Sequence, residues 1–117
     1  MPDMEIINQL AEDLGSDTVL KLMGVFKEDV DKRIIAIQGY LSADGGDLQE
    51  IRIHAHSLKG LCRTYGAAQS GDVAMALQDA CDAGDTAMIR TKAQAALEVI
   101  PAEVDAVIEV VRGLTAN

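Results

Sequence analysis

The chain has 117 residues and a formal net charge of −9, with 49% hydrophobic and 25% charged residues. This length supports one domain, residues 1–117, with a single core and no room for a large catalytic cleft. Nonspecific binding to nucleic acid requires basic residues that neutralise the phosphates. Because the chain is acidic, we expect it to bind neither nucleic acid nor an anionic membrane surface. The sequence has no basic-then-apolar leader and no run of 18 apolar residues, which favours a cytoplasmic protein.

The composition also indicates the fold class. Aromatic residues make up only 3% of the chain, whereas β-sheet proteins usually carry more aromatic and β-branched residues. We therefore expect helices that pack through Ala, Leu, Ile and Val. The two cysteines, Cys62 and Cys81, are predicted to be free buried thiols, because a chain of this size without an export signal rarely needs a disulfide.

Turn signals divide the chain into five helical segments. These segments are residues 6–14, 18–41, about 47–65, 68–83, and from 85 onward. Ser16 and Asp17 are expected to cap the second segment, and Asp85 the fifth. Asp44-Gly45-Gly46 is a turn signal, and Asp47 with Glu50 resembles a capping box at the start of the third segment. Gly66 is expected at the end of that segment.

The apolar residues of the long segments recur three or four apart, which predicts one buried face on each helix. Gly24 and Gly39 interrupt the second segment, and each costs up to ~1 kcal/mol relative to Ala. Both would let another helix approach closely. Pro101 removes a backbone donor and is expected to kink the fifth helix. Together the segments predict an all-α, up-and-down antiparallel four-helix bundle with a short additional N-terminal helix that covers one end.

The third segment contains both histidines of the chain. Its apolar positions follow a 3-4-3-4-3 rhythm and predict a buried seam made of Leu48, Ile51, Ala55, Leu58, Cys62 and Tyr65. At 100° per residue, His54 lies roughly 60° from the centre of the seam and His56 roughly 140°. We therefore expect His54 at the margin of the core and His56 in water.

A basic stripe surrounds the exposed histidine. Arg52, His56, Lys59 and Arg63 are spaced 4, 3 and 4 apart, so they share one side of the helix. A charge stripe by itself is usually a solvated face. The alternative is an anion site in which cations lower the pKa of the imidazole and keep it neutral and nucleophilic. Gly60 favours this alternative, because a side chain one turn from His56 would cover the ring.

The motif His56-Ser57-Leu58-Lys59-Gly60, followed by Gly66-Ala67, resembles the signature of histidine-containing phosphotransfer (HPt) domains. That pattern runs H-x-L-K-G, five residues, then G-A. The resemblance extends over almost the whole chain, because the order of a short helix and four longer ones and the Gly84-Asp85 turn also match. The sequence departs from many members at Leu61 and Cys62, where small Ser or Ala residues are common.

The resemblance implies a fold, an activity and partners. HPt domains are four-helix bundles that relay phosphoryl groups between receiver-domain aspartates in two-component phosphorelays. His56 aligns with the phosphoryl acceptor, and Lys59 and Gly60 align with the lysine and glycine of the family. The expected partners are response-regulator receiver domains and a hybrid histidine kinase. A monomer without a cofactor or bound metal is expected. The sequence contains no nucleotide-binding glycine loop, so the chain is not expected to be an ATP-dependent kinase.

One apolar residue is not explained by the core. Ile53 lies roughly 160° from the centre of the seam, so we expect it to be exposed. It is either a stray surface residue or part of a landing surface for a receiver helix, together with the bare backbone at Gly60. Three polar neighbours, Arg52, Ser57 and Arg63, are further candidate binding residues.

Three alternatives to a phosphocarrier differ in how well the residues fit them. His54 and His56 form H-x-H, but residues two apart on a helix point about 200° from each other and do not chelate one metal. The dimerisation domains of sensor kinases usually have an acidic residue and a Thr-Pro-Leu run after their histidine, which Ser57-Leu58-Lys59 does not match. The remaining alternative is a helical module that binds and inhibits a receiver or kinase without carrying phosphate.

Overall fold

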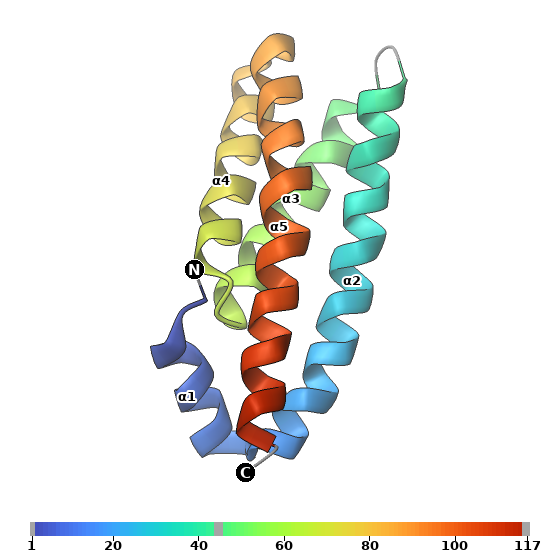
Figure 1. The fold of residues 1–117 in the computed structure, drawn as a ribbon. Helices are drawn as coiled ribbons and strands as arrows, with labels where there is room; N and C mark the ends of the chain where they lie inside the picture. The colour runs from blue at the N-terminus through green and yellow to red at the C-terminus, as the bar shows by residue number, and fades with distance from the viewer. Residues whose placement is uncertain (1, 44–45, 116–117) are drawn as a thin grey trace.

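A computed structural model describes residues 2–43 and 46–115 of the chain. These residues form α1 (Met4–Leu14), α2 (Ser16–Ser42), α3 (Leu48–Thr64), α4 (Ala68–Ala83) and α5 (Thr86–Thr115), and none of them is in a strand (Figure 1). The predicted all-α class is therefore confirmed. Two residues of the predicted turn, Asp44 and Gly45, lie outside the described residues, whereas Gly46 is exposed.

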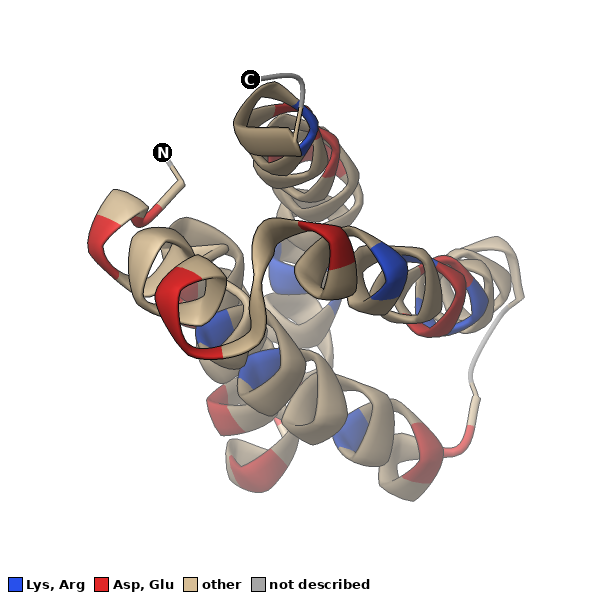
Figure 2. Cartoon of the chain, turned by 90° about the horizontal axis from the view of Figure 1, so that it is seen from below, with Lys and Arg blue, Asp and Glu red and all other residues tan. Residues whose placement is uncertain are grey.

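The four longer helices pack in a ring. α3 contacts α2 and α4, and α5 contacts the same two helices from the other side. Figure 1 shows α2 and α4 running in one direction along the molecule and α3 and α5 in the other. α1 packs against α2 at one end. The result is an elongated rod of 48 × 20 × 19 Å, and the view from below shows acidic residues on several of its helices (Figure 2).

Each long helix contributes fully buried side chains to one core, among them Phe26, Leu58, Leu77 and Ile100. Burial of a side chain of this size contributes about 1.5–3 kcal/mol. The buried positions of α3 are those that the sequence predicted, except at its two ends. Leu48 is 38% exposed.

The two ends of the predicted seam differ from its middle because of their surroundings. Leu48, the first residue of α3, borders an open hollow that it shares with Arg52 and Asp82, so no neighbouring helix covers it. Tyr65 is half-buried, and its ring lies 4.8 Å from that of Phe26, centroid to centroid. The seam is therefore fully closed only from Ile51 to Cys62.

The ends of α3 and the start of α5 follow the capping signals. The Asp47 carboxylate accepts a hydrogen bond from the Gln49 amide at 2.9 Å. Gly66 follows α3 with φ 86°, a conformation that side chains disfavour. The Asp85 carboxylate accepts from the Met88 amide at 3.1 Å. The predicted helix ends at Asp47, Gly66 and Asp85 are confirmed.

Other helix ends differ from expectation. α2 begins at Ser16, two residues early, and Gly15 precedes it without any side-chain hydrogen bond to the first turn. The reason is that Gly15, with φ 84°, turns the chain directly from α1 into α2. α1 is also longer than expected, because Asp3 caps it through the amides of Glu5 and Ile6.

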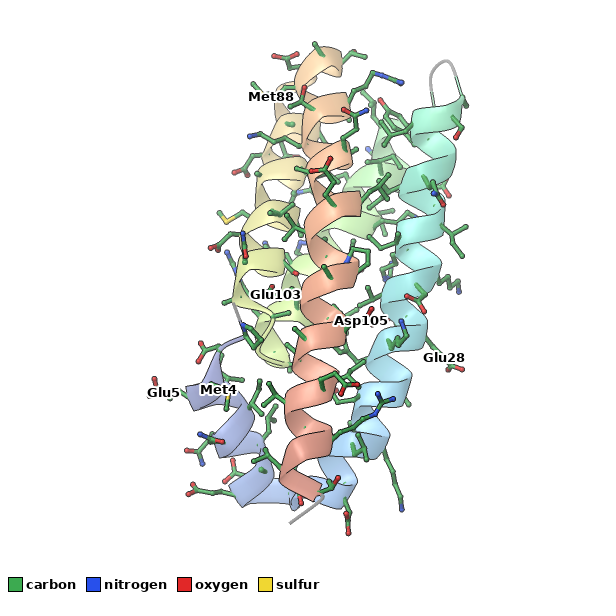
Figure 3. The ribbon with its side chains drawn as sticks, in the orientation of Figure 1. Met4, Glu5, Glu28, Met88, Glu103 and Asp105 are labelled. Carbon is green, nitrogen blue, oxygen red and sulfur yellow. The ribbon has the colours of Figure 1, made fainter. Side chains whose placement is uncertain are left out.

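α4 starts at Ala68 without a capping side chain of its own, since the residue before it is Ala67. Its cap comes from α5. The buried Glu103 carboxylate accepts hydrogen bonds from the Ser70 amide at 2.6 Å and the Gln69 amide at 3.3 Å (Figure 3). Burial would raise the pKa of Glu103, but hydrogen bonds, those from Ser70 among them, favour the carboxylate and bring the pKa below its ordinary value.

Two polar contacts fasten α2 to α5. Lys27 lies 3.3 Å from Asp105 of α5 and 3.4 Å from Asp31 of its own helix. At the other end of α2, the Arg90 guanidinium donates to the carbonyl of Leu41 at 3.0 Å. α5 continues as one helix through Pro101. The kink that the sequence predicts there stays a prediction.

Candidate functional site

The outer face of α3 carries the motif. Ile51 and Cys62 are buried on the opposite side of the helix, and this fixes the rotation of α3 about its axis. His56 and Gly60 are consequently exposed, and Ile53 is 55% exposed. The predicted exposure of His56 and Ile53 is confirmed. Ser57 and Lys59 flank them and are half-buried.

The His56 ring is held by α4. Its Nδ1 atom lies 3.2 Å from the Oε1 atom of Gln78. Because an amide oxygen only accepts hydrogen bonds, Nδ1 must carry the proton in this contact. In the neutral ring Nε2 is then the unprotonated nitrogen, with its lone pair available. No other hydrogen bond to this ring occurs within residues 2–43 and 46–115. The motif does not include Gln78, so the sequence analysis missed it.

His54 has different surroundings, at the seam between α2 and α3. Its side chain is only 16% exposed. The Arg33 guanidinium donates to its Nδ1 atom at 3.2 Å, and Arg33 also bonds to Asp29 at 3.0 Å. The Nε2 atom of His54 faces the Glu50 carboxylate at 3.8 Å. Glu50 therefore points along the helix toward His54 and does not complete the predicted capping box. His54 lies at the margin of the core, as predicted.

The basic stripe is mostly neutralised by α4. Arg52 forms an ion pair with Asp82, whose hydrogen bond and charge raise the pKa of the guanidinium. Arg63 forms an ion pair with Asp72 at 3.4 Å. Among the described residues, Lys59 is the cation of the stripe that has no ion-pair partner. One free ammonium group therefore lies near His56.

The α4 partners of the stripe lie on a line that runs opposite to α3. Arg52 faces Asp82, His56 faces Gln78 and Arg63 faces Asp72. The residue numbers of each pair add up to about the same value, as antiparallel neighbouring helices require. Gln78 and Asp82 are four residues apart and share one side of α4, and this spacing was the signal that could have identified these two partners.

Gly71 and Gly60, the two glycines near the site, differ in whether packing requires them. A Cβ atom on Gly71 would lie 2.6 Å from the Cγ atom of Arg63, so Gly71 lets that side chain lie flat on α4. A Cβ atom on Gly60 would meet nothing within 4 Å, so packing within the described chain does not require this glycine. The space beside His56 is open at this position.

The two departures from the motif face inward. Leu61 is half-buried against the core, and Cys62 is fully buried. Burial, assisted by the charge of Glu103, raises the pKa of the Cys62 thiol to about 12. Cys81 is half-buried, and both cysteines are free. A protonated, buried Cys62 is unreactive and serves as a small core residue.

Comparison with known families decides what kind of domain this is. A sequence model of the family described as Hpt domain matches residues 21–111. The chain belongs to the Hpt domain family. That membership assigns it to two-component phosphotransfer, in which Hpt domains are phosphocarriers and not kinases. No curated protein and no solved structure matches the chain.

The match contains all of α3 and α4, and with them the exposed histidine, Lys59 and Gly60. The Hpt domain is a helical bundle, in agreement with the five helices of the described residues. No helix in the described part of the chain is long and apolar enough to cross a membrane.

Proposed function

We propose that this Hpt domain, an up-and-down antiparallel four-helix bundle with α1 at one end, is a phosphorelay intermediate. His56 accepts a phosphoryl group from the phospho-aspartate of one receiver domain and passes it to the aspartate of another. The receiver of a hybrid histidine kinase is one such donor. The observation that carries this proposal is the exposed His56 ring with Nδ1 on Gln78 and Nε2 free.

The transfer step needs no proton movement on the histidine. The lone pair of Nε2 attacks phosphorus in line, the P–N bond forms, and the P–O bond to the aspartate breaks. The aspartate leaves as a carboxylate, and the proton on Nδ1 stays in its hydrogen bond to Gln78. The reverse reaction with a second receiver regenerates the free ring. The chain supplies no nucleotide chemistry and acts as a phosphocarrier.

Lys59 and Gly60 support this step in different ways. The free Lys59 ammonium stabilises negative charge on the equatorial phosphoryl oxygens. Gly60 has no side chain, which leaves the approach to Nε2 open. Packing within the described chain does not explain this glycine, because a Cβ atom there would meet nothing within 4 Å. Arg52 and Arg63 are held by carboxylates of α4, so their roles are to contact the receiver and to keep α3 in register with α4.

The docking surface is the exposed face of α3 around the histidine. Ile53, Ser57 and Gly60 lie at helical spacing beside His56 and form a strip with little charge. A helix of the receiver packs on this strip, which holds the aspartyl phosphate in line with Nε2. Ile53 provides the apolar contact. The proposed setting is the cytoplasm, as the sequence predicted.

Phosphoryl transfer from a labelled receiver tests the assignment of the histidine. Wild type and His54→Gln should take up label, whereas His56→Gln should take up none. The label should be labile in acid and stable in alkali, as a phosphorus–nitrogen bond is. Circular dichroism of each variant verifies the fold. Label on folded His56→Gln would exclude His56 as the acceptor. If the wild-type chain inhibits a receiver without taking up label, the protein is instead a helical module that binds the receiver without carrying phosphate.

A further inference from the structure

The outward face of α2 has no partner within the described chain. Its exposed residues are spaced 4, 3, 4, 3 and 4 apart and form what we call the α2 stripe: Lys21, Val25, Glu28, Lys32, Ile35 and Gly39. Val25 and Ile35 are each 66% exposed, more than any other exposed large hydrophobic residue of the described chain. Glu28 points away from the bundle (Figure 3). This alternating spacing is that of a two-helix coiled-coil seam.

Two glycines on this side of α2 are unexplained by the monomer. Gly24 and Gly39 are exposed and lie inside a long helix, where Ala would be the better helix former. A Cβ atom on either would meet nothing within 4 Å. The described chain therefore provides no close neighbour that needs these glycines.

The charges of the stripe are also unpaired within the described residues. Lys21, Glu28 and Lys32 form no ion pair there. By contrast, Lys27 and Arg33 on the flanks of the same helix bond to Asp105, Asp29 and His54. The α2 stripe thus differs from its flanks in having both free charges and exposed apolar side chains.

The stripe is complementary to itself when two copies run antiparallel and cross near the level of Val30. Val25 then faces Ile35 of the second copy, and Glu28 faces its Lys32. By the same symmetry Lys21 meets Gly39, and Gly24 lies at the level of Ala36 on the opposite edge of the contact. Val25 and Ile35 thus have apolar partners, Glu28 and Lys32 face opposite charges, and Lys21 lies over a glycine.

From this pattern we propose that α2 binds α2 of a second copy of this chain in an antiparallel homodimer. The charge pattern favours a second copy as the occupant, because the order apolar, acid, base, apolar on α2 matches itself when it is read in reverse. A single pair of helices buries less than the roughly 1,200 Å² typical of stable interfaces, and two copies of a −9 chain repel each other. The dimer is therefore weak and reversible.

The dimer leaves His56 accessible. His56 contacts α4, which lies diagonally across the ring from α2. The inference does not depend on the proposed phosphoryl transfer. It differs from the monomer that the sequence predicted, and the state of the chain in solution decides between the two.

Charge exchange tests the antiparallel pairing. Sedimentation velocity of the full chain at concentrations up to about 1 mM, a range that reveals weak association, should show a concentration-dependent dimer for wild type. Glu28→Lys alone places two lysines against each other, and Lys32→Glu alone places two glutamates against each other, so both should be monomeric. An equimolar mixture of the two variants should dimerise again, because the lysine introduced by the first substitution then faces the glutamate introduced by the second.

Apolar substitution tests the same interface independently. Ile35→Glu should weaken dimerisation by about tenfold or more, since it places a charge against the apolar side chain of Val25. Met88→Glu, an equally drastic change at an exposed residue of α5, should have no effect. Circular dichroism checks that α2 stays helical in each variant. A wild-type chain that is monomeric throughout, a dimer that survives Ile35→Glu, or a mixture that fails to dimerise would each overturn the proposal.

Discussion

At the residue scale, the two histidines of α3 differ in what their Nδ1 atoms contact. Nδ1 of His54 accepts a hydrogen bond from Arg33, so its ring is tied into the seam between α2 and α3. Nδ1 of His56 meets the oxygen of Gln78, so its ring donates there and presents Nε2 to solvent. Two residues of the same type, two positions apart, therefore have opposite tautomers and different availability for chemistry.

Gln78 should act as a positioning residue for His56. Gln78→Met keeps the size of the side chain but removes the acceptor, and loss of one hydrogen bond of about 0.5–1.5 kcal/mol should slow transfer roughly twofold to thirteenfold. The ¹⁵N shifts of His56 should also move toward a mixture of tautomers, which a purely structural role would not cause. Asp79→Asn, at the next and exposed position, is the control. Unchanged rate and shifts would remove Gln78 from the mechanism.

Lys59 should matter more than the two arginines of the basic stripe, because it is the one cation of that stripe without an ion-pair partner among the described residues. Lys59→Ala should slow phosphoryl transfer by about 1–3 kcal/mol of barrier, roughly tenfold to a hundredfold, without a change in melting temperature. Arg63→Ala should have a smaller effect on single-turnover transfer from a phosphorylated receiver. If the two variants ranked in the opposite order, the ion pair with Asp72 would not prevent Arg63 from reaching the phosphoryl group.

At the scale of elements, the position of α4 depends on a contact from α5. Ala67 precedes α4 and has no side chain that could cap the helix. Glu103 of α5 takes this role, because its carboxylate accepts hydrogen bonds from two amides of the first turn of α4. α4 in turn holds Gln78, Asp72 and Asp82 against α3. The geometry around His56 therefore depends on a buried carboxylate two helices away.

Glu103→Gln should reduce the free energy of unfolding at pH 7 by about 1–3 kcal/mol, the contribution of hydrogen bonds to a charged group. Because the pKa of Glu103 is lowered by folding, its contribution is present above the ordinary Glu value of 4.5 and is lost as the pH falls through the folded pKa. Urea unfolding at pH 7 and pH 3 should therefore show a smaller difference between variant and wild type at pH 3. The exposed Glu98 of the same helix provides the control Glu98→Gln. An equal loss at both pH values would mean that packing, and not charge, accounts for the role of Glu103.

At the scale of the whole molecule, the two proposed recognition surfaces lie on the outside of α3 and α2, while the core residues keep the helices in place. Burial of Ile51, Ala55, Leu58 and Cys62 leaves Ile53 outside, so a change at Ile53 does not disturb the core. Affinity for a receiver can therefore be varied separately from stability.

Ile53→Asp should weaken the binding of an unphosphorylated receiver by about tenfold or more, because it introduces a charge into an apolar contact. The melting temperature should stay within about one or two degrees of wild type, since exposed substitutions usually change stability by under 0.5 kcal/mol. Titration calorimetry with wild type, Ile53→Asp and the control Met88→Asp, at an exposed residue of α5, measures the effect. Wild-type affinity for Ile53→Asp would place the docking surface elsewhere on the bundle.

The sequence by itself determined the local features of this protein. The 3-4 spacing in α3 places Ile51 inside and His56 outside because a helix turns 100° per residue, whatever surrounds it. Gly66 and Asp85 mark helix ends through their own conformational and hydrogen-bonding properties. The motif around His56 indicated the family for a similar reason, because its residues are neighbours in the chain and act on one exposed helical face.

Only the tertiary structure decided the contacts between residues distant in the chain. Gln78 as the partner of His56, Asp82 and Asp72 as the partners of the arginines, and Glu103 as the cap of α4 all depend on how one helix is aligned along another. Leu48 is exposed for a similar reason, because the pattern within α3 contains no information on where the neighbouring helix ends. Alignment between helices is fixed by packing of whole faces, which the periodicity of a single helix does not record.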